Sequence, residues 1–304
     1  MRKIYFFVAS ACIIASGIWR HHDCGGNEPL ASAEQEMLHD APGDDFNLPP
    51  VDLKFHSGKS EADIPARSTT STTRSGVKIL VFDVIGTVVD WQGSLSAEGS
   101  ELGKAKGLKA DWAAFAKDWA SAYGQSVHDV SSGALPWATV DELNRKSLDR
   151  VLGHLNISGL SDQEKDDLNL AWHRLKPWPD SVAGLARLRK GFVITPLSNC
   201  NRALLTDLSR KDGLPWNDIW SVEGIRRYKP DPAVYRGAAE HFHVRSDEMM
   251  MVAAHQYDLD AAKKLGMKTA YVVRVTENET NPPQPGEYDL VVSDLDELAS
   301  RLGL

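Results

Sequence analysis

Residues 79–90 read Ile-Leu-Val-Phe-Asp-Val-Ile-Gly-Thr-Val-Val-Asp and place one carboxylate where a reaction can take place. The apolar run Ile79–Phe82 is typical of a buried strand, and it brings Asp83 to the expected carboxyl end of that strand, with Gly86 and Thr87 close behind. In an open parallel sheet, ligands bind at the carboxyl ends of strands, and a carboxylate on such a rigid support is suited to be a nucleophile. The pattern also fits an aspartate that caps the next element, so this stretch alone leaves both interpretations open.

Two polar residues, Ser198 and Asn199, follow a second apolar run in the same way. We expect their hydroxyl and amide groups to point into the crevice that holds Asp83, because the carboxyl ends of parallel strands meet at one edge of a sheet. The alternative is that they cap the helix that opens at Asn201 and Arg202. Both roles are compatible, since a helix N-terminus attracts an anionic substrate group.

A cation and an aromatic residue come next along the chain. Lys229 lies between Tyr228 and Pro230 in a proline-rich loop, at the expected carboxyl end of a third strand. A lone lysine in a loop is usually a solvated charge, but the neighbouring ring of Pro230 restricts this one. Tyr235 lies a turn or two into the following helix, where a core or surface role is the alternative.

A second carboxylate, Asp258, follows a fourth apolar run and is placed to orient Lys229 or a water molecule. His255 lies at the exit of the same run, although a lone histidine is more often structural than catalytic. Asp260 is expected to face solvent or to cap the helix that follows.

Short apolar runs alternate with helical patterns from residue 77 onward. The expected strands cover 78–82, 192–197, 219–222, 249–252, 269–273 and 290–292, and the helices between them include 202–211, 232–241, 259–265 and 295–302. Alternation of this kind predicts an α/β fold with a doubly wound parallel, Rossmann-like sheet and helices on both of its faces.

One long stretch between residues 90 and 179 interrupts this alternation and shows no convincing strand. Its helical patterns cover 110–123, 140–155 and 162–175, and four aromatic residues share one helical face: Trp112, Phe115, Trp119 and Tyr123. Such a stripe is more often a packing face than a ligand site. A helical insert just after the first strand predicts a cap above Asp83 that excludes water and contacts the substrate.

The composition excludes several classes of protein. With 42% hydrophobic and 25% charged residues, the chain can bury an ordinary globular core. Its formal net charge of -8 disfavours nucleic acid as a partner, because binding phosphates needs a basic face. The cysteines Cys12, Cys24 and Cys200 predict neither a disulfide framework nor a cysteine zinc site.

The N-terminus predicts a targeting segment. Arg2 and Lys3 precede an apolar run over 4–19, and 31–33 offers a small-residue cleavage site, so we interpret 1–33 as a signal peptide. The protein would then be exported, periplasmic or secreted. An uncleaved membrane anchor is the second interpretation, and a start codon placed upstream of a cytoplasmic enzyme is the third. Residues 34–76 lack any apolar period and are expected to form a disordered linker.

The four site stretches together resemble the haloacid dehalogenase (HAD) superfamily, and most of all the type II (S)-2-haloacid dehalogenases. The resemblance covers about 77–304 and rests on Phe82-Asp83-Val84-Ile85-Gly86-Thr87, Leu197-Ser198-Asn199-Cys200-Asn201, Lys229-Pro230-Asp231-Pro232-Ala233-Val234-Tyr235, Val252-Ala253-Ala254-His255-Gln256-Tyr257-Asp258 and Leu214-Pro215-Trp216. It implies a HAD core over 77–94 and 180–304, with a helical cap over 95–179.

Two positions separate this chain from the phosphatases of that superfamily. The phosphatases usually carry an acidic residue two places after the nucleophile, where this chain has Ile85, which cannot transfer a proton. They also usually hold magnesium with a Gly-Asp pair after the fourth strand, where the position four before Asp258 is Ala254. Because magnesium prefers carboxylate oxygens, a phosphatase is disfavoured.

The resemblance implies a hydrolytic dehalogenase that needs no metal and no cofactor. Asp83 would displace the halide from a short (S)-2-halo acid with inversion, and water would hydrolyse the Asp83 ester to release a 2-hydroxy acid. Lys229 would keep Asp83 ionised, and Asp258 would position Lys229 or the water. The implied substrate-binding residues are Thr87, Ser198, Asn199, Tyr235 and His255. The implied partner is a small halogenated carboxylic acid, and a homodimer is possible.

The chain departs from the resembled family in the cap and at the fourth strand. The dehalogenases usually place an arginine directly after a tryptophan in the first cap helix, whereas Ala120 follows Trp119 here. At the fourth strand, Ala253 and His255 occupy positions that are Ser and Asn in well-known members. Loss of the arginine removes electrostatic help for halide departure. Two alternatives therefore stay open, a HAD-fold hydrolase of another substrate and a catalytically degenerate binding protein.

Overall fold

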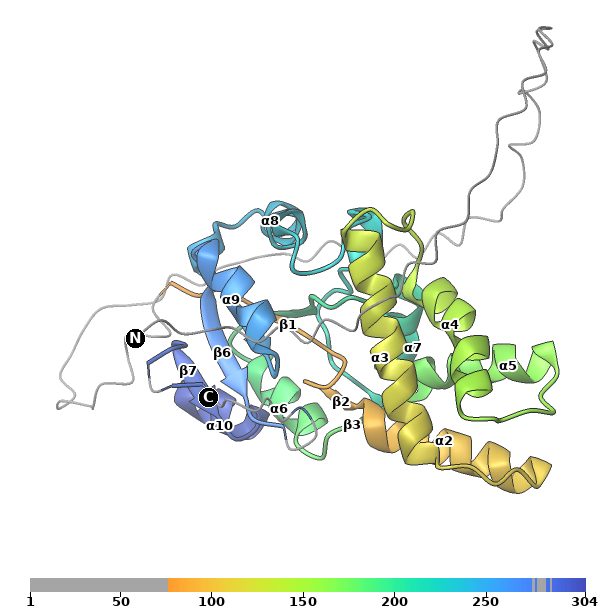
Figure 1. Ribbon diagram of the computed structural model, residues 1–304. Coiled ribbons are helices and arrows are strands. Elements are labelled where there is room, and N and C mark those ends of the chain that lie inside the picture. Colours follow the sequence, from red (N-terminus) through yellow and green to blue (C-terminus); the bar gives the residue numbers. More distant parts are fainter. Residues whose placement is uncertain (1–75, 275–276, 278–282, 285) are drawn as a thin grey trace, which may run out of the picture. The chain divides into compact units, whose positions relative to one another are not determined.

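The computed structural model describes residues 76–274, 277, 283–284 and 286–304 (Figure 1). The expected signal peptide lies outside the described residues, and so does the expected linker apart from Gly76. None of the helices formed by the described residues is long and apolar enough to cross a membrane.

Five parallel strands form the main sheet in the order β4-β1-β5-β6-β7. They are β1 (Ile79–Phe82), β4 (Val193–Pro196), β5 (Met249–Ala253), β6 (Lys268–Val272) and β7 (Leu290–Val292). Every residue of β1 and β5 is buried, as expected for central strands that are covered on both faces. The predicted parallel α/β fold is confirmed.

Helices cover this sheet on two sides. The core helices are α6 (Ser181–Leu188), α7 (Arg202–Asp212), α8 (Pro232–His241), α9 (Gln256–Lys264) and α10 (Leu295–Arg301), with a short 3-10 helix η3 (Ser246–Glu248) before β5. Helix α8 packs on α9, and α6 packs on α10. In Figure 1 these two pairs lie on opposite sides of β1.

The chain order of the strands opens a crevice at β1. After β1 the chain returns in β4 on one side of it, and β5 then takes the other side. A reversal of this kind leaves a crevice outside the carboxyl ends of the strands. Asp83, the first residue after β1, is therefore placed at that crevice by the topology alone.

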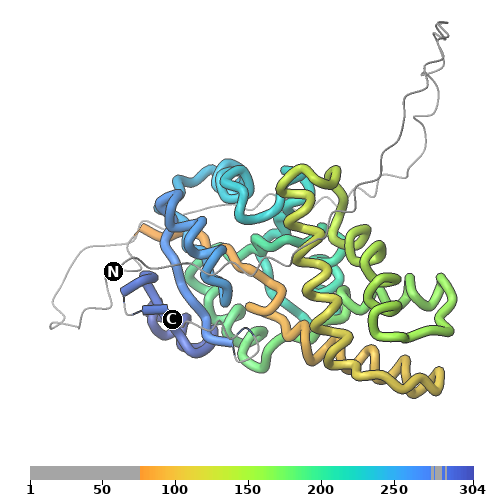
Figure 2. Tube along the Cα trace, in the orientation of Figure 1, coloured from red at the N-terminus to blue at the C-terminus, as the bar shows by residue number. Residues whose placement is uncertain are grey.

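A helical insert follows β1, as the sequence predicts. It comprises α2 (Trp91–Lys106), α3 (Trp112–Ser131), α4 (Val140–His154), α5 (Asp162–Asn169) and the 3-10 helix η1 (Leu170–Arg174). Figure 2 traces the chain from β1 into the insert and back to the core. The exact limits of core and cap given in the sequence analysis stay a prediction.

Two features of the insert differ from the sequence expectation. Strands β2 (Val89–Asp90) and β3 (Lys176–Pro177) form an antiparallel ribbon that joins the entry of the insert to its exit. Two residues a strand are too few to leave a periodic pattern. Helix α2 was not predicted, because its three internal glycines hide the helical period. Asp90 caps it by accepting a hydrogen bond from the Gly93 amide (2.9 Å).

The strand predicted over 219–222 is wrong. The segment instead passes beside β4 through individual polar contacts, and it ends in the 3-10 helix η2 (Val222–Gly224). The Trp220 amide donates to the Thr195 hydroxyl (3.4 Å), and that hydroxyl donates to the Asp218 carbonyl (3.2 Å). A side chain thus takes the place of a backbone ladder, which an apolar pattern cannot reveal.

Candidate active site

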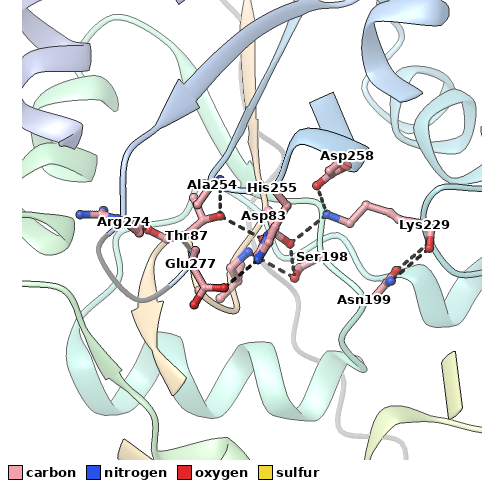
Figure 3. A network of polar contacts seen from close by, with 12 residues as sticks. Asp83, Thr87, Ser198, Asn199, Lys229, Ala254, His255, Asp258, Arg274 and Glu277 are labelled. Atoms are coloured by element: carbon pink, nitrogen blue, oxygen red, sulfur yellow. Dashed lines mark hydrogen bonds and ion pairs between the residues drawn. The ribbon is translucent and has the colours of Figure 1, made fainter. Parts of the chain in front are cut away.

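Asp83 lies at the centre of a network of polar contacts (Figure 3). Its side chain is buried, with the residue 4% exposed. Oδ1 accepts hydrogen bonds from Lys229 Nζ (2.9 Å) and Ser198 Oγ (3.0 Å). Oδ2 accepts one from Thr87 Oγ1 (3.0 Å) and lies 3.0 Å from His255 Nδ1. Residues that follow β1, β4 and β5 and the loop residue Lys229, all singled out by the sequence, therefore converge on one carboxylate.

The turn after β1 fixes the direction of the Asp83 side chain. The Asp83 amide continues the sheet by donating to the Val252 carbonyl (3.0 Å). Gly86 then takes a φ of +83°, which favours glycine. This turn brings Thr87 back under Asp83, where its hydroxyl also accepts a hydrogen bond from the Ala254 amide (2.9 Å).

Ser198 and Asn199 belong to the site and do not cap a helix. Ser198 Oγ accepts a hydrogen bond from the Val84 amide (3.2 Å), which holds it beside Asp83. Asn199 clamps the backbone of Lys229: its Oδ1 accepts from the Lys229 amide (2.7 Å), and its Nδ2 donates to the Lys229 carbonyl (3.3 Å). The N-cap position of α7 is taken by Asn201.

Lys229 bridges two buried carboxylates. Its ammonium group donates to Asp83 and to Asp258, and the residue is 2% exposed. Burial disfavours the charge, but Asp258 and Asp83 together hold the pKa of Lys229 well above its usual range. Burial likewise opposes ionisation of Asp83, yet Lys229 and His255 outweigh it and hold the pKa of Asp83 well below its usual range. Asp83 is therefore an anion at neutral pH.

Asp258 is supported from its far side by Tyr235, whose hydroxyl donates to Asp258 Oδ1 (2.6 Å). Burial raises the pKa of Asp258, and Lys229 and this hydroxyl act against that rise. Burial and the neighbouring Asp258 also raise the pKa of Tyr235, so the phenol stays protonated and can donate. Tyr235 thus contacts Asp258, which in turn holds Lys229.

His255 is an imidazolium that lies between two carboxylates. Its Nδ1 faces Asp83, and its Nε2 lies 3.1 Å from Glu277 Oε2. Burial lowers the pKa of His255, but the hydrogen bonds with Asp83 and Glu277 raise it to about 10. Trp91 Nε1 donates to the other oxygen of Glu277 (2.5 Å).

A cavity of about 210 Å³ opens beside Asp83, between the core and the insert. From the insert it is lined by Trp91, Ala120, Tyr123, Gly124 and Trp172, and from the core by Asp83, Ile85, Ser198, Asn199, His255 and Tyr257. Helix α3 thus covers Asp83, and Tyr123 fixes the helix there by donating to the Asn199 carbonyl (2.8 Å).

The position after Trp119 does face the cavity. Ala120 lines it, and the described residues that line the cavity include no lysine or arginine. Four sequence-predicted site residues lie behind the cavity wall instead: Thr87, Lys229, Tyr235 and Asp258. Three of them act on Asp83 or Lys229 through hydrogen bonds, so they support the wall that the substrate would meet.

Glu277 and Arg274 were missed by the sequence analysis. Both follow β6, so the rule that chemistry gathers at the carboxyl ends of strands could have pointed to them. Arg274 Nε donates to the Thr87 carbonyl (2.8 Å), and its guanidinium forms a double contact with Asp180. It therefore anchors the turn that carries Thr87.

The residues at the site do not fit a magnesium ion held as in the phosphatases. The Lys229 ammonium already binds both Asp83 and Asp258, and Ile85 and Ala254 offer no side-chain oxygen. Among the residues that the structure describes, no cluster of three or more histidine, cysteine or acidic residues could hold a metal.

The sequence profile of the haloacid dehalogenase-like hydrolases matches residues 77–266, which is more than half of the chain. The chain belongs to this family. This chain is 28% identical over 231 residues to (S)-2-haloacid dehalogenase 1 of Pseudomonas sp. (strain CBS-3). The match covers 74% of this chain and 98% of that protein.

Two crystal structures extend the likeness. A defluorinating L-2-haloacid dehalogenase is 36% identical with a TM-score of 0.73, and the match covers 79% of this chain and 100% of that one. A second L-2-haloacid dehalogenase is 35% identical with a TM-score of 0.70, covering 75% and 100% of the two chains. The protein is thus a HAD hydrolase homologous to the 2-haloacid dehalogenases.

Proposed function

We propose that this HAD hydrolase cleaves the carbon–halogen bond of short (S)-2-halo acids without a metal ion. The observation that carries the proposal is the state of Asp83: a buried carboxylate, kept ionised by Lys229, at the wall of a small cavity. The names of the most similar relatives point to the same substrate class.

In the first step, an Asp83 oxygen attacks the carbon that bears the halogen, from the side opposite the halogen. The new carbon–oxygen bond forms as the carbon–halogen bond breaks, and the halide leaves with the bonding electron pair. The carbon is inverted, and the acid is left as an ester on Asp83. Because Asp83 is already ionised, this step needs no proton transfer.

In the second step, water adds to the carbonyl carbon of the Asp83 ester. The bond between that carbon and the substrate oxygen breaks, and the 2-hydroxy acid leaves with one proton of the water while the other goes to solvent. Lys229 Nζ and Ser198 Oγ, which contact Asp83 Oδ1, are placed to stabilise negative charge on that oxygen during the addition.

The test is chloride release from L-2-chloropropionate by the full-length protein in chelator-treated buffer. We expect release by the parent protein and release at background level by Asp83→Asn. Asp260→Asn is the matched control, since Asp260 is an exposed carboxylate on α9 that contacts Tyr288. Release that requires an added divalent cation, or that survives in Asp83→Asn, would exclude the proposed mechanism.

Ala120 supports a second candidate, a hydrolase with the same Asp83 nucleophile and another leaving group. The cavity wall at this position is a methyl group instead of a cation, so a departing halide would find less electrostatic stabilisation there. Absence of halide release from folded protein, together with Asp83-dependent hydrolysis of an activated ester, would favour this candidate.

A further inference from the structure

Asp83 is saturated with hydrogen bonds in the described structure. Each of its oxygens contacts two donors, namely Lys229 and Ser198 at Oδ1, and Thr87 and His255 at Oδ2. A carboxylate oxygen offers about two lone-pair sites, and attack on carbon consumes one of them. One of the four donors must therefore leave Asp83 before the reaction.

His255 is the donor best placed to leave Asp83, because it is the most exposed of the four. Lys229, Ser198 and Thr87 are almost fully buried, and each has a second contact that holds it in place. The His255 side chain is 22% exposed and lines the cavity, so an incoming molecule meets it directly. Its departure would free Oδ2, the oxygen that Lys229 does not bind.

Glu277 provides a separate anchor for the His255 ring. It contacts Nε2 and leaves Nδ1 to face Asp83. Glu277 is itself held by the Trp91 indole. It also lies directly over the turn after Asp83, where a Cβ built on Gly86 would come within 2.7 Å of its carboxyl carbon. Figure 3 shows Glu277 and Asp83 on either side of His255.

An anionic substrate in the cavity would have to pair with a cation, and His255 is placed to supply that charge. An anionic acid that enters a small, partly apolar cavity must be paired to offset its desolvation. The described residues that line the cavity include no lysine or arginine, and the position of the resembled cap arginine is Ala120. The imidazolium of His255 is the lining group that carries positive charge.

We propose that Glu277 is a positioning residue that holds His255 at the cavity wall, so that its Nδ1–H moves from Asp83 to the carboxylate of the arriving acid. The ring would turn about its contact with Glu277, and the same movement would pair the substrate and free Asp83 Oδ2 for attack. This inference rests on the proposed function, because it assumes an acid as substrate.

The groups around His255 set its titration. Asp83 and Glu277 contact the ring directly, and Tyr257 packs on it with ring centres 5.8 Å apart. Lys229 and Asp258 lie behind Asp83. Removing the Glu277 charge lowers the pKa of His255 from about 10 and leaves the Asp83 contribution in place. The ring of the variant then loses its proton at a lower pH than the ring of the parent. Binding of the acid should therefore be lost at that lower pH.

The test compares the full-length parent with Glu277→Gln. The pKa of His255 is followed by NMR on histidine-labelled protein, with the signal assigned through His255→Asn. Affinity for propionate, an unreactive acid, is measured across the same pH range. We expect Glu277→Gln to lower the pKa of His255 by about one unit or more, and to move the alkaline loss of propionate binding by the same amount. Each unit corresponds to a tenfold change.

Glu287→Gln is the matched control, because Glu287 is partly exposed, lies on the same connection and accepts a hydrogen bond from the Gln284 amide. We expect it to leave both curves unchanged. A Glu277→Gln protein with an unchanged His255 pKa, or with propionate binding weakened equally at every pH, would overturn the inference. Neither readout needs turnover, so a parent that releases no chloride would refute the proposed function without deciding the role of Glu277.

Discussion

At the scale of single residues, the charge state of the site depends on Lys229. It lies between Asp83 and Asp258, and all three side chains are almost completely buried. A buried ion cluster of this kind gains little over an apolar core while it is complete, but removal of one partner leaves an uncompensated charge. Lys229 therefore offsets the buried charges of both carboxylates and keeps Asp83 ionised.

We predict that Lys229→Met lowers the free energy of unfolding by about 3–5 kcal/mol at pH 7, as measured by urea denaturation. The deficit should shrink as the pH falls. In the parent, the depressed pKa of Asp83 contributes stability that is present above the unfolded pKa and is lost on acidification. In the variant, Asp258 loses the cation that opposes the effect of burial, so its pKa rises further and its protonation relieves the folded state.

Lys78→Met is the control for this prediction. Lys78 also pairs with a carboxylate, Glu248 (2.7 Å), but its side chain is 47% exposed. Water screens such a pair, so Lys78→Met should lower the free energy of unfolding much less than Lys229→Met does. An equal cost for both substitutions, or a Lys229→Met deficit that does not change between pH 7 and pH 5, would contradict the account of the buried cluster.

The sequence predicted the site residues that follow a strand, and it was weaker on their partners. Asp83, Ser198 and His255 meet because topology brings the ends of the parallel strands β1, β4 and β5 together. That Tyr235 would contact Asp258, with no place on the cavity wall, could not be predicted, because it depends on how α8 turns against α9. Glu277 was not predicted as a site residue, because it lies several residues past the end of β6.

At the scale of elements, contacts outside the Asp83 network also join the insert to the core. The β2–β3 ribbon joins its two ends. On another side, the buried His173 contacts Asp141 of α4 (3.0 Å) and Asp207 of α7 (2.7 Å). Burial lowers the pKa of His173, but the two carboxylates outweigh it and raise the pKa. The contact therefore joins insert and core as an ion pair.

Inside the insert, α2 and α3 pack through glycine. The indole of Trp112 lies against Gly99 and Gly103 of α2, and a Cβ on Gly99 would meet the ring at 2.4 Å. We predict that Gly99→Ala lowers the free energy of unfolding by about 1–3 kcal/mol, although alanine is the better helix former by about 1 kcal/mol. Thermal or urea unfolding measures the change.

Gly153→Ala is the matched substitution, because Gly153 lies in α4 and a Cβ there would meet nothing within 4 Å. Only helix propensity acts at this position, so the substitution should stabilise the protein by up to about 1 kcal/mol. The account of the α2–α3 contact fails if both substitutions change stability in the same direction.

Elements with a strong apolar period were predicted, and those with a weak one were not. The limits of α8 match the predicted 232–241, since Pro232 and the Asp231 cap mark its start. Helix α2 was not predicted, because glycines break its helical period. Two of these glycines leave the space that the Trp112 ring fills. The apolar run 219–222 resembles a strand, yet polar contacts with Thr195 decide its conformation.

At the scale of the whole molecule, the proposed chemistry needs core and insert together. The core supplies Asp83 and its donors, while α3 supplies Ala120, Tyr123 and Gly124 to close the cavity above them. The expected export signal lies outside the described residues, and export stays a prediction.

The central claim is that Asp83 attacks the substrate and that water attacks Asp83. A single turnover in H₂¹⁸O, with the full-length protein in excess over L-2-chloropropionate, tests it most directly by mass spectrometry. Because water adds to the ester carbonyl carbon, we predict that ¹⁸O enters the Asp83 carboxylate, while the first product carries an unlabelled oxygen from the protein. Label in the product of that first turnover, with none in the peptide that contains Asp83, would contradict the account.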